Sequence, residues 1–145
     1  MLVEEIMQRE VKVLQHTDTV RHAAEVMRDA DLGFLPIKSS EGQIVGTLTD
    51  RDIVVRVLAE GKSVDGAVSD VMSIDLVSCG PKDDLHKAEN LLGEHHVSRI
   101  LCLDDNKQIL GVVALADLAR AEDSDAVGHT MHEIKASSVA TSPLM

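Results

Sequence analysis

The sequence has almost no aromatic residues, since its 145 residues include one Phe and neither Trp nor Tyr. Basic residues are also scarce: 14 Lys and Arg stand against 25 Asp and Glu, and the formal net charge is −11. Proteins that bind nucleic acid normally present a basic surface, and single-strand binders add aromatic stacking platforms. We therefore expect no nucleic-acid partner. A small anionic ligand would need cations and N–H groups gathered locally to offset the global repulsion.

Long hydrophobic runs are absent as well. The longest apolar stretch, residues 109–116, is far shorter than the roughly 20 residues that span a membrane. The N-terminus, MLVEEIMQREV, is acidic within its first five residues, which is not typical of a signal peptide. These features predict a soluble cytoplasmic protein with no membrane partner.

The sequence contains only two cysteines, Cys79 and Cys102, and their spacing fits neither a zinc site nor a redox motif. We expect both to lie reduced in a core, with redox sensing as the alternative. The spacing of His129-x-x-His132-Glu133 would suit a metal only on a helix and with a third ligand, so a solvated surface is the preferred interpretation. No nucleophile elbow, phosphate loop or zinc motif is present, so we predict neither an enzyme nor a metal site nor a cofactor.

The chain repeats itself once, at a shift of 65 residues without a gap. Apolar positions match throughout, and the shift places Asp18 on Asp83, Ala23 on Ala88, Asp52 on Asp117 and residues 43–46 on residues 108–111. A period of this length indicates two copies of one supersecondary unit, each of which buries an apolar face against its neighbour.

Each copy predicts the element order βαββα, because helical and alternating apolar spacings follow one another in the same way. In the first copy we expect strands at 11–14, 34–38 and 44–48, a helix opened by residues 17–19, and a helix at 52–60 that ends at Gly61. In the second copy we expect strands at 76–79, 99–103 and 109–113, a helix opened by residues 81–84, and a helix at 117–122. The predicted fold class is α+β, with α/β-type repeats at 1–60 and 68–122, a linker at 61–67, and a partly disordered tail at 123–145 that includes a helix near 125–135.

The stretch GTLTDRDIV, residues 46–54, contains Thr49-x-x-Asp52 before an apolar run. This spacing is typical of a capping box, in which the hydroxyl and the carboxylate each accept a backbone N–H. It also suits a sugar-phosphate, because an ionised carboxylate accepts from both ribose hydroxyls and a helix N-terminus favours a phosphate. The second copy has Ala114 in place of Thr49 but keeps the aspartate as Asp117. This comparison indicates that capping is dispensable at this position and favours a ligand role for Asp52, with Asp117 marking a weaker second site.

This ordered series of residues resembles the cystathionine-β-synthase (CBS) domain, which occurs in tandem pairs. The resemblance covers residues 1 to about 122 and is closest to small stand-alone bacterial CBS-pair proteins. The matching stretches are Leu35-Pro36-Ile37, residues 46–53, Val71-Met72, residues 98–101, and Gly111-Val112-Val113 with Asp117.

The resemblance implies two repeats that pack through their sheets about a pseudo-twofold axis and leave two clefts. In the family these clefts often bind AMP, ADP, ATP, NAD(H) or S-adenosylmethionine, and the pairs commonly form homodimers. It therefore implies a regulatory sensor that signals to an unknown effector protein.

Further ligand-binding residues are expected beside Asp52. Arg51 and Arg99 are the cations placed near a phosphate, with a solvated arginine or a surface ion pair as the alternative. The full predicted set is Thr49, Asp50, Arg51, Asp52, Asp117, Arg99, the small residues Gly33 and Ser98 that would let a purine or ribose approach, and Val13 and Ser78, whose early strands would offer backbone groups to an adenine edge.

A second function class stays open. The chain could be a ligand-free scaffold or interaction protein that keeps the fold while its site has decayed. The replacement of Thr49 by Ala114 and of Pro36 by Leu101 in the second copy favours that interpretation there.

Overall fold

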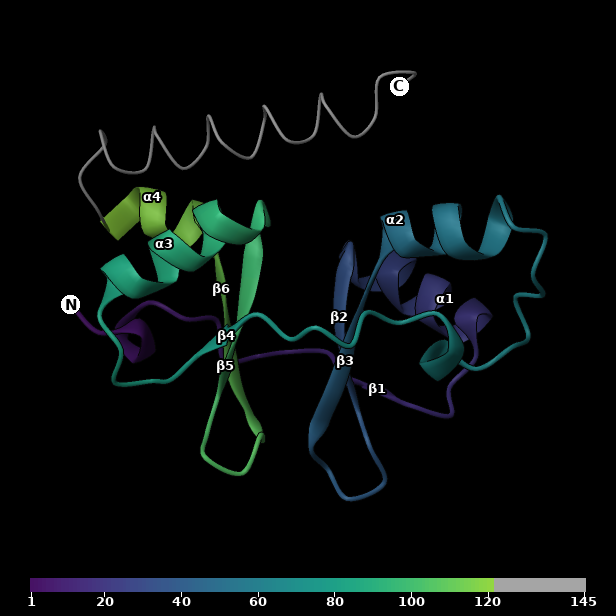
Figure 1. Cartoon of the computed structure of the whole chain (residues 1–145), viewed down its shortest axis with the longest axis horizontal. Coiled ribbons are helices and arrows are strands. Elements are labelled where there is room, and N and C mark those ends of the chain that lie inside the picture. The colour runs from purple at the N-terminus through teal and green to yellow at the C-terminus, as the bar shows by residue number, and fades with distance from the viewer. Residues whose placement is uncertain (122–145) are drawn as a thin grey trace. The chain divides into compact units, whose positions relative to one another are not determined.

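The computed structural model describes residues 1–121, and Figure 1 labels its helices and strands. The order βαββα occurs twice, as the repeat predicts. The first copy contains β1 (Leu14–Gln15), α1 (Val20–Ala30), β2 (Phe34–Lys38), β3 (Ile44–Thr49), α2 (Asp50–Asp52) and the π-helix η2 (Ile53–Leu58). The second contains β4 (Ser78–Cys79), α3 (Leu85–His95), β5 (Arg99–Leu103), β6 (Ile109–Ala114) and α4 (Leu115–Ala121). Short 3-10 helices precede the copies, η1 (Val3–Glu5) and η3 (Val68–Asp70). The predicted tail at 123–145 and its helix lie outside the described residues.

Each copy forms a three-stranded sheet in which the middle strand is parallel to the first and antiparallel to the third. The register slips between Ile37 and Lys38 in one sheet and between Cys102 and Leu103 in the other, which are equivalent positions under the 65-residue shift. The early strands are shorter than expected and begin later, because only two residues in each pair with the middle strand.

The longer helices begin where their sequences predict. Thr19 caps α1 by accepting the N–H of His22 at 3.0 Å, and Asp84 caps α3 by accepting the N–H of His86 at 2.9 Å. Helix α3 ends at His96, whose φ of 53° is left-handed. Both helices of a copy lie on one face of that copy's sheet (Figure 1).

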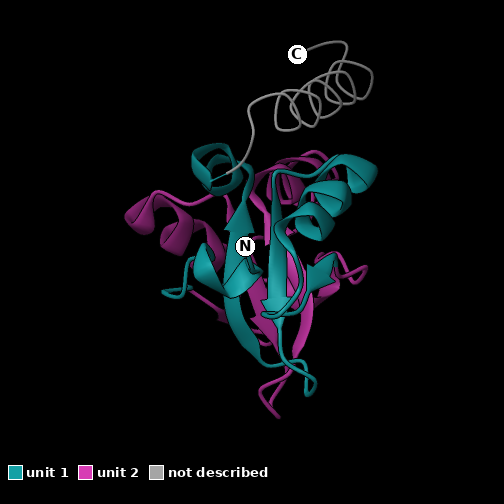
Figure 2. Cartoon of the chain, turned by 90° about the vertical axis from the view of Figure 1, so that its left-hand side faces the viewer, with its two compact units in different colours: residues 1–11, 77–145 teal, residues 12–76 magenta. Residues whose placement is uncertain are grey.

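The two compact units differ from the two sequence repeats at their first segments (Figure 2). One unit is Lys12–Leu76, and the other combines Met1–Val11 with the chain from Val77 onward. We call residues 1–11 and 68–76 the leading segments, because each precedes one repeat in the sequence. Each leading segment packs against the sheet of the other repeat.

The leading segments contribute to the hydrophobic cores. Val3 and Met7 lie in one core with Ile100, Val113 and Leu118. Val68 and Val71 lie in the other core with Leu14, Val20, Leu35 and Leu48. A leading segment is therefore an integral part of its unit, because its apolar side chains supply part of the buried surface that stabilises the fold.

Each leading segment is also hydrogen-bonded to the third strand of its unit. Ser73 and Thr47 exchange two backbone hydrogen bonds of 2.9 Å, and Gln8 and Val112 make the equivalent pair at the same distance. A glycine of the third strand makes room for this contact. A Cβ on Gly46 would lie 2.9 Å from the Ser73 carbonyl oxygen, and one on Gly111 would lie 2.8 Å from that of Gln8.

We expect Gly46→Ala to destabilise the protein by roughly 1–3 kcal/mol, because the new methyl group overlaps backbone that cannot rotate away. Gly66→Ala is the matched control, since a Cβ there meets nothing closer than 3.5 Å. Chemical denaturation monitored by far-UV circular dichroism measures both. Equal midpoints for the two variants would contradict this account of the close approach.

Candidate functional site

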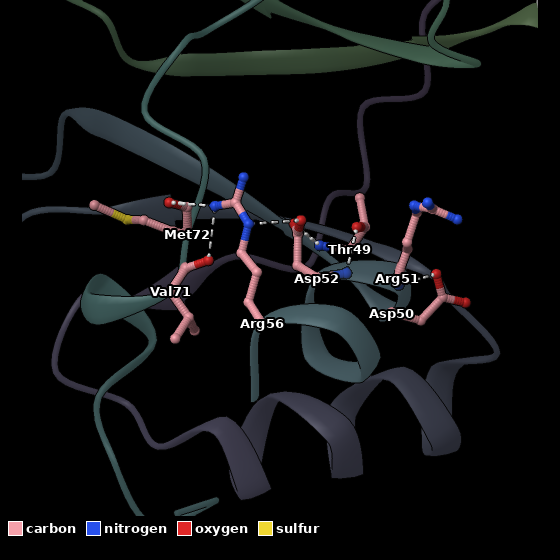
Figure 3. A network of polar contacts seen from close by, with 7 residues as sticks. All are labelled: Thr49, Asp50, Arg51, Asp52, Arg56, Val71 and Met72. Carbon is pink, nitrogen blue, oxygen red and sulfur yellow. Dashed lines mark hydrogen bonds and ion pairs between the residues drawn. The ribbon is translucent and has the colours of Figure 1, made fainter. Parts of the chain in front are cut away.

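The turn between β3 and α2 is a complete capping box (Figure 3). Thr49 Oγ1 accepts the backbone N–H of Asp52 at 3.1 Å, and Asp52 Oδ2 accepts the backbone N–H of Thr49 at 2.9 Å. The structural half of the sequence interpretation is therefore confirmed. The Asp52 side chain is part-buried and keeps 15% of its surface exposed, so part of it still reaches solvent.

The remaining N–H groups of this turn also have acceptors from the protein. Arg51 N donates to Asp50 Oδ1 at 2.9 Å, and Asp50 N donates to the Gly33 carbonyl at 3.1 Å. Gly33 has a packing role here, because a Cβ on it would lie 2.9 Å from Asp50 Oδ2. A phosphate at this helix start would have to replace the carboxylate or hydroxyl oxygens that now occupy the donors.

Arg56, which the sequence interpretation missed, contacts Asp52. Arg56 Nε lies 3.7 Å from Asp52 Oδ1, an i,i+4 ion pair, and Figure 3 shows its guanidinium between Asp52 and the leading segment. Arg56 Nη1 donates to the carbonyls of Val71 at 3.2 Å and Met72 at 3.3 Å. The spacing of four residues within an expected helix was the available signal.

The helix that carries Arg56 is not the regular α-helix expected for residues 52–60. After Asp52 it continues as the π-helix η2, which ends at Leu58, before the left-handed Gly61. Such π segments are rare and frequently occur at functional sites. Only Val57 is buried on η2, while Val54, Val55 and Leu58 are 51%, 46% and 72% exposed.

The second copy holds its aspartate differently. Asp117 Oδ2 accepts the N–H of Ala114 at 2.9 Å, so the carboxylate half of the capping box is kept without a threonine. Asp117 Oδ1 also accepts a short hydrogen bond from Arg120 and one of 3.4 Å from Gln8 of the leading segment. The Asp117 side chain is only 2% exposed.

This geometry corrects one step of the sequence argument. The sequence comparison predicts that capping is dispensable where Ala114 replaces Thr49, and this prediction is wrong. In fact the aspartate caps the turn in both copies, so its retention has a structural cause in each. What differs between the copies is the exposure of the carboxylate, which is open at Asp52 and closed at Asp117.

Some of the other predicted residues lie at the same end of the sheet as the aspartate of their unit. Phe34 pairs with Thr49, so Gly33 lies at the same end of its sheet as Asp50 and Asp52. In the other unit, Arg99 pairs with Ala114, and the Ser98 carbonyl accepts the N–H of Leu115 at 2.9 Å. Ser98 and Arg99 are both exposed.

The early-strand residues lie further along their sheets. Val13 precedes β1 and is half-buried, and Ser78 pairs with Leu101 inside β4. Because the parallel pairing begins only at Leu14 with Ile37, Val13 is displaced along the sheet from the Thr49 turn.

The two cysteines face one another across neighbouring strands, since Cys79 and Cys102 are register partners in β4 and β5. Both are free and buried, as expected. Burial raises the pKa of the Cys79 thiol to about 12 and also raises the pKa of Cys102. The thiolate needed for redox chemistry is therefore disfavoured at neutral pH.

Residues 1–121 contain no group of three or more His, Cys, Asp or Glu residues that would hold a metal ion. The candidate pair His129 and His132 lies outside the described residues. None of the helices in that part of the chain is long and apolar enough to cross a bilayer.

Comparison with known proteins identifies the family of this chain. The CBS domain matches the chain twice, at residues 3–59 and 68–124. This chain belongs to the CBS domain family. It is 37% identical over 117 residues to the CBS domain-containing protein YhcV of Bacillus subtilis, a match that covers 81% of this chain and 82% of YhcV. The CBS pair also matches the homoserine O-acetyltransferase of Methanocorpusculum labreanum, 28% identical over 122 residues, but covers only 24% of that enzyme.

Solved structures share the CBS-pair fold. The CBS domain protein TA0289 of Thermoplasma acidophilum superposes with a TM-score of 0.83 and 26% identity, covering 93% of this chain and 76% of TA0289. The protein PAE2072 of Pyrobaculum aerophilum, solved with AMP, has a TM-score of 0.77 and 18% identity over 91% of this chain and 99% of its own. The CBS pair of MJ0100, solved with 5′-methylthioadenosine and S-adenosylmethionine, has a TM-score of 0.73 and 21% identity over 83% and 94% of the two chains.

Removal of the two aspartates should affect stability unequally. We expect Asp117→Ala to cost about 2 kcal/mol of unfolding free energy, because it leaves the buried Ala114 N–H without an acceptor. Asp52→Ala should cost about 1 kcal/mol, since it removes only the carboxylate half of a cap that is part-buried. Urea titrations of both variants against the wild type measure the difference. A larger loss for Asp52→Ala would show that the exposure of the two carboxylates does not reflect their structural roles.

Proposed function

We propose that this CBS pair is a regulatory module that binds an adenosine-containing ligand at the Thr49–Asp52 turn and signals to a partner protein. The Asp52 carboxylate accepts hydrogen bonds from the ribose hydroxyls, and Thr49 with Arg51 lies near the 5′ substituent. The module itself carries out no chemistry. Its output is a change in how the chain presents itself to another protein.

The exposure of the Asp52 carboxylate is the observation that carries this proposal. Its Oδ1 lies 3.7 Å from Arg56 Nε, which is beyond hydrogen-bonding distance, and the side chain is 15% exposed. An ionised carboxylate has about four acceptor positions, and a ribose offers two neighbouring O–H donors. Asp117 is 2% exposed and already accepts from Arg120 and Gln8, so we place the ligand at Asp52 first.

The fold neighbours support the ligand class at the level of adenosine. PAE2072 was solved with AMP. MJ0100 was solved with 5′-methylthioadenosine, which is a thioether, and with S-adenosylmethionine, which is a sulfonium compound. These ligands differ in charge and in their 5′ substituents but share adenine and ribose. A site built around a ribose-binding carboxylate accounts for that shared part. The choice among AMP, ADP, ATP, NAD(H) and S-adenosylmethionine depends on the 5′ end, where Asp50 and Thr49 oxygens now occupy the N–H donors.

Isothermal titration calorimetry with AMP, ATP, NADH and S-adenosylmethionine tests the proposal directly. We expect at least one of them to bind the wild type, and Asp52→Ala to weaken its binding at least tenfold, since two charge-assisted hydrogen bonds are lost. Glu41→Ala is the control, because it removes an exposed carboxylate in the same unit, outside the turn and the leading segment. Failure of all four ligands would reject the sensor. Wild-type affinity in Asp52→Ala would reject the site.

The alternative function is a ligand-free scaffold, and the second copy favours it locally. There the aspartate is buried and satisfied, and the turn has no hydroxyl. On this view the Asp117 turn retains only its structural role. One ligand bound per chain in the calorimetric titration would agree with a single working site at Asp52.

We further propose that the chain forms a homodimer through the exposed face of η2. Val54, Val55 and Leu58 are uncharged, and in a chain of net charge −11 such a patch is where a second copy approaches with least repulsion. Leu58→Asp should therefore shift the protein from dimer to monomer in light scattering coupled to gel filtration. Ile74→Asp, which alters an equally exposed residue on the leading segment, should leave the mass unchanged. A monomeric wild type, or a dimeric Leu58→Asp variant, would overturn this interface.

A further inference from the structure

We propose that Arg56 is a positioning residue that couples occupancy of Asp52 to the leading segment 68–76. This inference rests on the proposed function, because it assigns the route by which a ligand at Asp52 changes the rest of the chain. Arg56 was not among the residues that the sequence singled out. Its role follows from the contacts that it makes on two sides.

The first side of Arg56 faces the candidate site. Its Nε is 3.7 Å from Asp52 Oδ1, close enough to orient the carboxylate by charge but too far to use up the acceptor. Oδ2 is already fixed by the Thr49 N–H. Arg56 thus holds Oδ1 toward solvent in the orientation that a ribose hydroxyl would use. In Figure 3, Asp50 and Arg51 lie on the other side of Asp52 from Arg56.

The second side of Arg56 faces the leading segment. Nη1 donates to the carbonyls of Val71 and Met72. Directly after them, Ser73 pairs with Thr47 of β3, and β3 leads back into Thr49. The contacts therefore form a continuous series, which runs from Asp52 through Arg56 to the leading segment and from there to β3, the strand that precedes Asp52.

These contacts lie close to the point where the chain passes from one compact unit to the other. Leu76 is the last residue of one compact unit and Val77 the first of the other, so Met72 lies just before the crossing. The Val77 carbonyl accepts the N–H of Leu101 in β5 at 3.1 Å. A change in order at Val71 and Met72 is thus passed along a short stretch of backbone to the sheet of the second unit.

The second unit repeats the connection with different residues. Its aspartate, Asp117, is bonded to Gln8 of the leading segment 1–11, which pairs with Val112 of β6. The chain crosses between units just after this segment, between Val11 and Lys12. Ser73 stands at the position equivalent to Gln8, and in this unit Arg56 makes the connection between the aspartate and the leading segment from the helix side. In both units a side chain connects the aspartate to the leading segment, although the side chain differs. This indicates that the connection matters more than the residue that makes it.

The coupling has a definite sign. A ribose bonded to Asp52 fixes the carboxylate, which fixes Arg56 and strengthens its hold on the two carbonyls. Ligand binding therefore orders residues 68–76, and by reciprocity a loosened segment weakens the ligand. Because Arg56 is about half exposed, we expect the low end of the usual range, a change in affinity of roughly fivefold.

Two variants separate the roles of Arg56. Arg56→Ala removes both sides of the contact. Arg56→Lys keeps a positive charge near Asp52, but a single ammonium cannot also bind both carbonyls in the geometry of a guanidinium. Arg21→Ala is the matched control, since it removes an exposed arginine paired with Asp65 at 3.2 Å in the same unit.

The experiment combines calorimetry with hydrogen–deuterium exchange of residues 68–76, with and without AMP or S-adenosylmethionine. We expect ligand to slow exchange in this segment in the wild type and in Arg21→Ala. In Arg56→Ala the affinity for either ligand should fall about fivefold and the ligand-dependent protection should disappear. In Arg56→Lys the affinity should return toward the wild-type value while the protection stays lost.

Each contrary result has a separate meaning. If the wild type binds neither ligand, the proposed function and the coupling both fall. If the wild type binds and Arg56→Ala keeps both affinity and protection, the coupling alone is wrong. If Arg56→Ala weakens AMP but leaves S-adenosylmethionine unchanged, Arg56 contacts a phosphate directly, and its role as a positioning residue is overturned.

Discussion

Both repeats depend on one hydrogen bond, in which an aspartate carboxylate accepts the backbone N–H of the residue three positions before it. It turns the chain from the third strand into the following helix, at Thr49–Asp52 and again at Ala114–Asp117. The carboxylate is needed there whether or not a ligand binds, because a helix start leaves N–H groups that require acceptors. The ribose-binding role proposed for Asp52 would be added to this structural requirement, whereas the carboxylate of Asp117 is buried by its structural contacts.

The hydrophobic effect acts on the same architecture through the leading segments. Val3 and Met7 complete one core, and Val68 and Val71 complete the other. Close backbone approach at Gly46 and Gly111 lets these segments hydrogen-bond to the third strands. The site and the cores are consequently not independent. One leading segment carries the carbonyls that bind Arg56, the ion-pair partner of Asp52, and the other carries Gln8, which contacts Asp117.

The fold was largely predictable because a gap-free repeat doubles every local signal. Strands 34–38 and 99–103 and the helix after Thr19 agree with the structure, since alternating and helical apolar spacings are local properties. The capping box was predictable from the Thr49-x-x-Asp52 spacing. The packing of each leading segment on the other repeat was not, because it depends on pairings between residues that are not neighbours in the sequence, such as Gln8 with Val112 and Thr47 with Ser73. The burial of Asp117 and the contacts of Arg56 were missed for the same reason, since Gln8, Val71 and Met72 belong to those segments.

The placement of the leading segments also bears on how a paired protein of this kind can arise. A single repeat with its own leading segment would have a segment without a sheet to pack on and a sheet without its segment. Two identical copies would satisfy both needs by giving their segments to each other, which is domain swapping between protomers. The tandem chain is therefore physically equivalent to a swapped dimer whose two protomers have been joined by residues 61–67. Once joined, the copies were free to diverge, one keeping an open carboxylate and the other enclosing it.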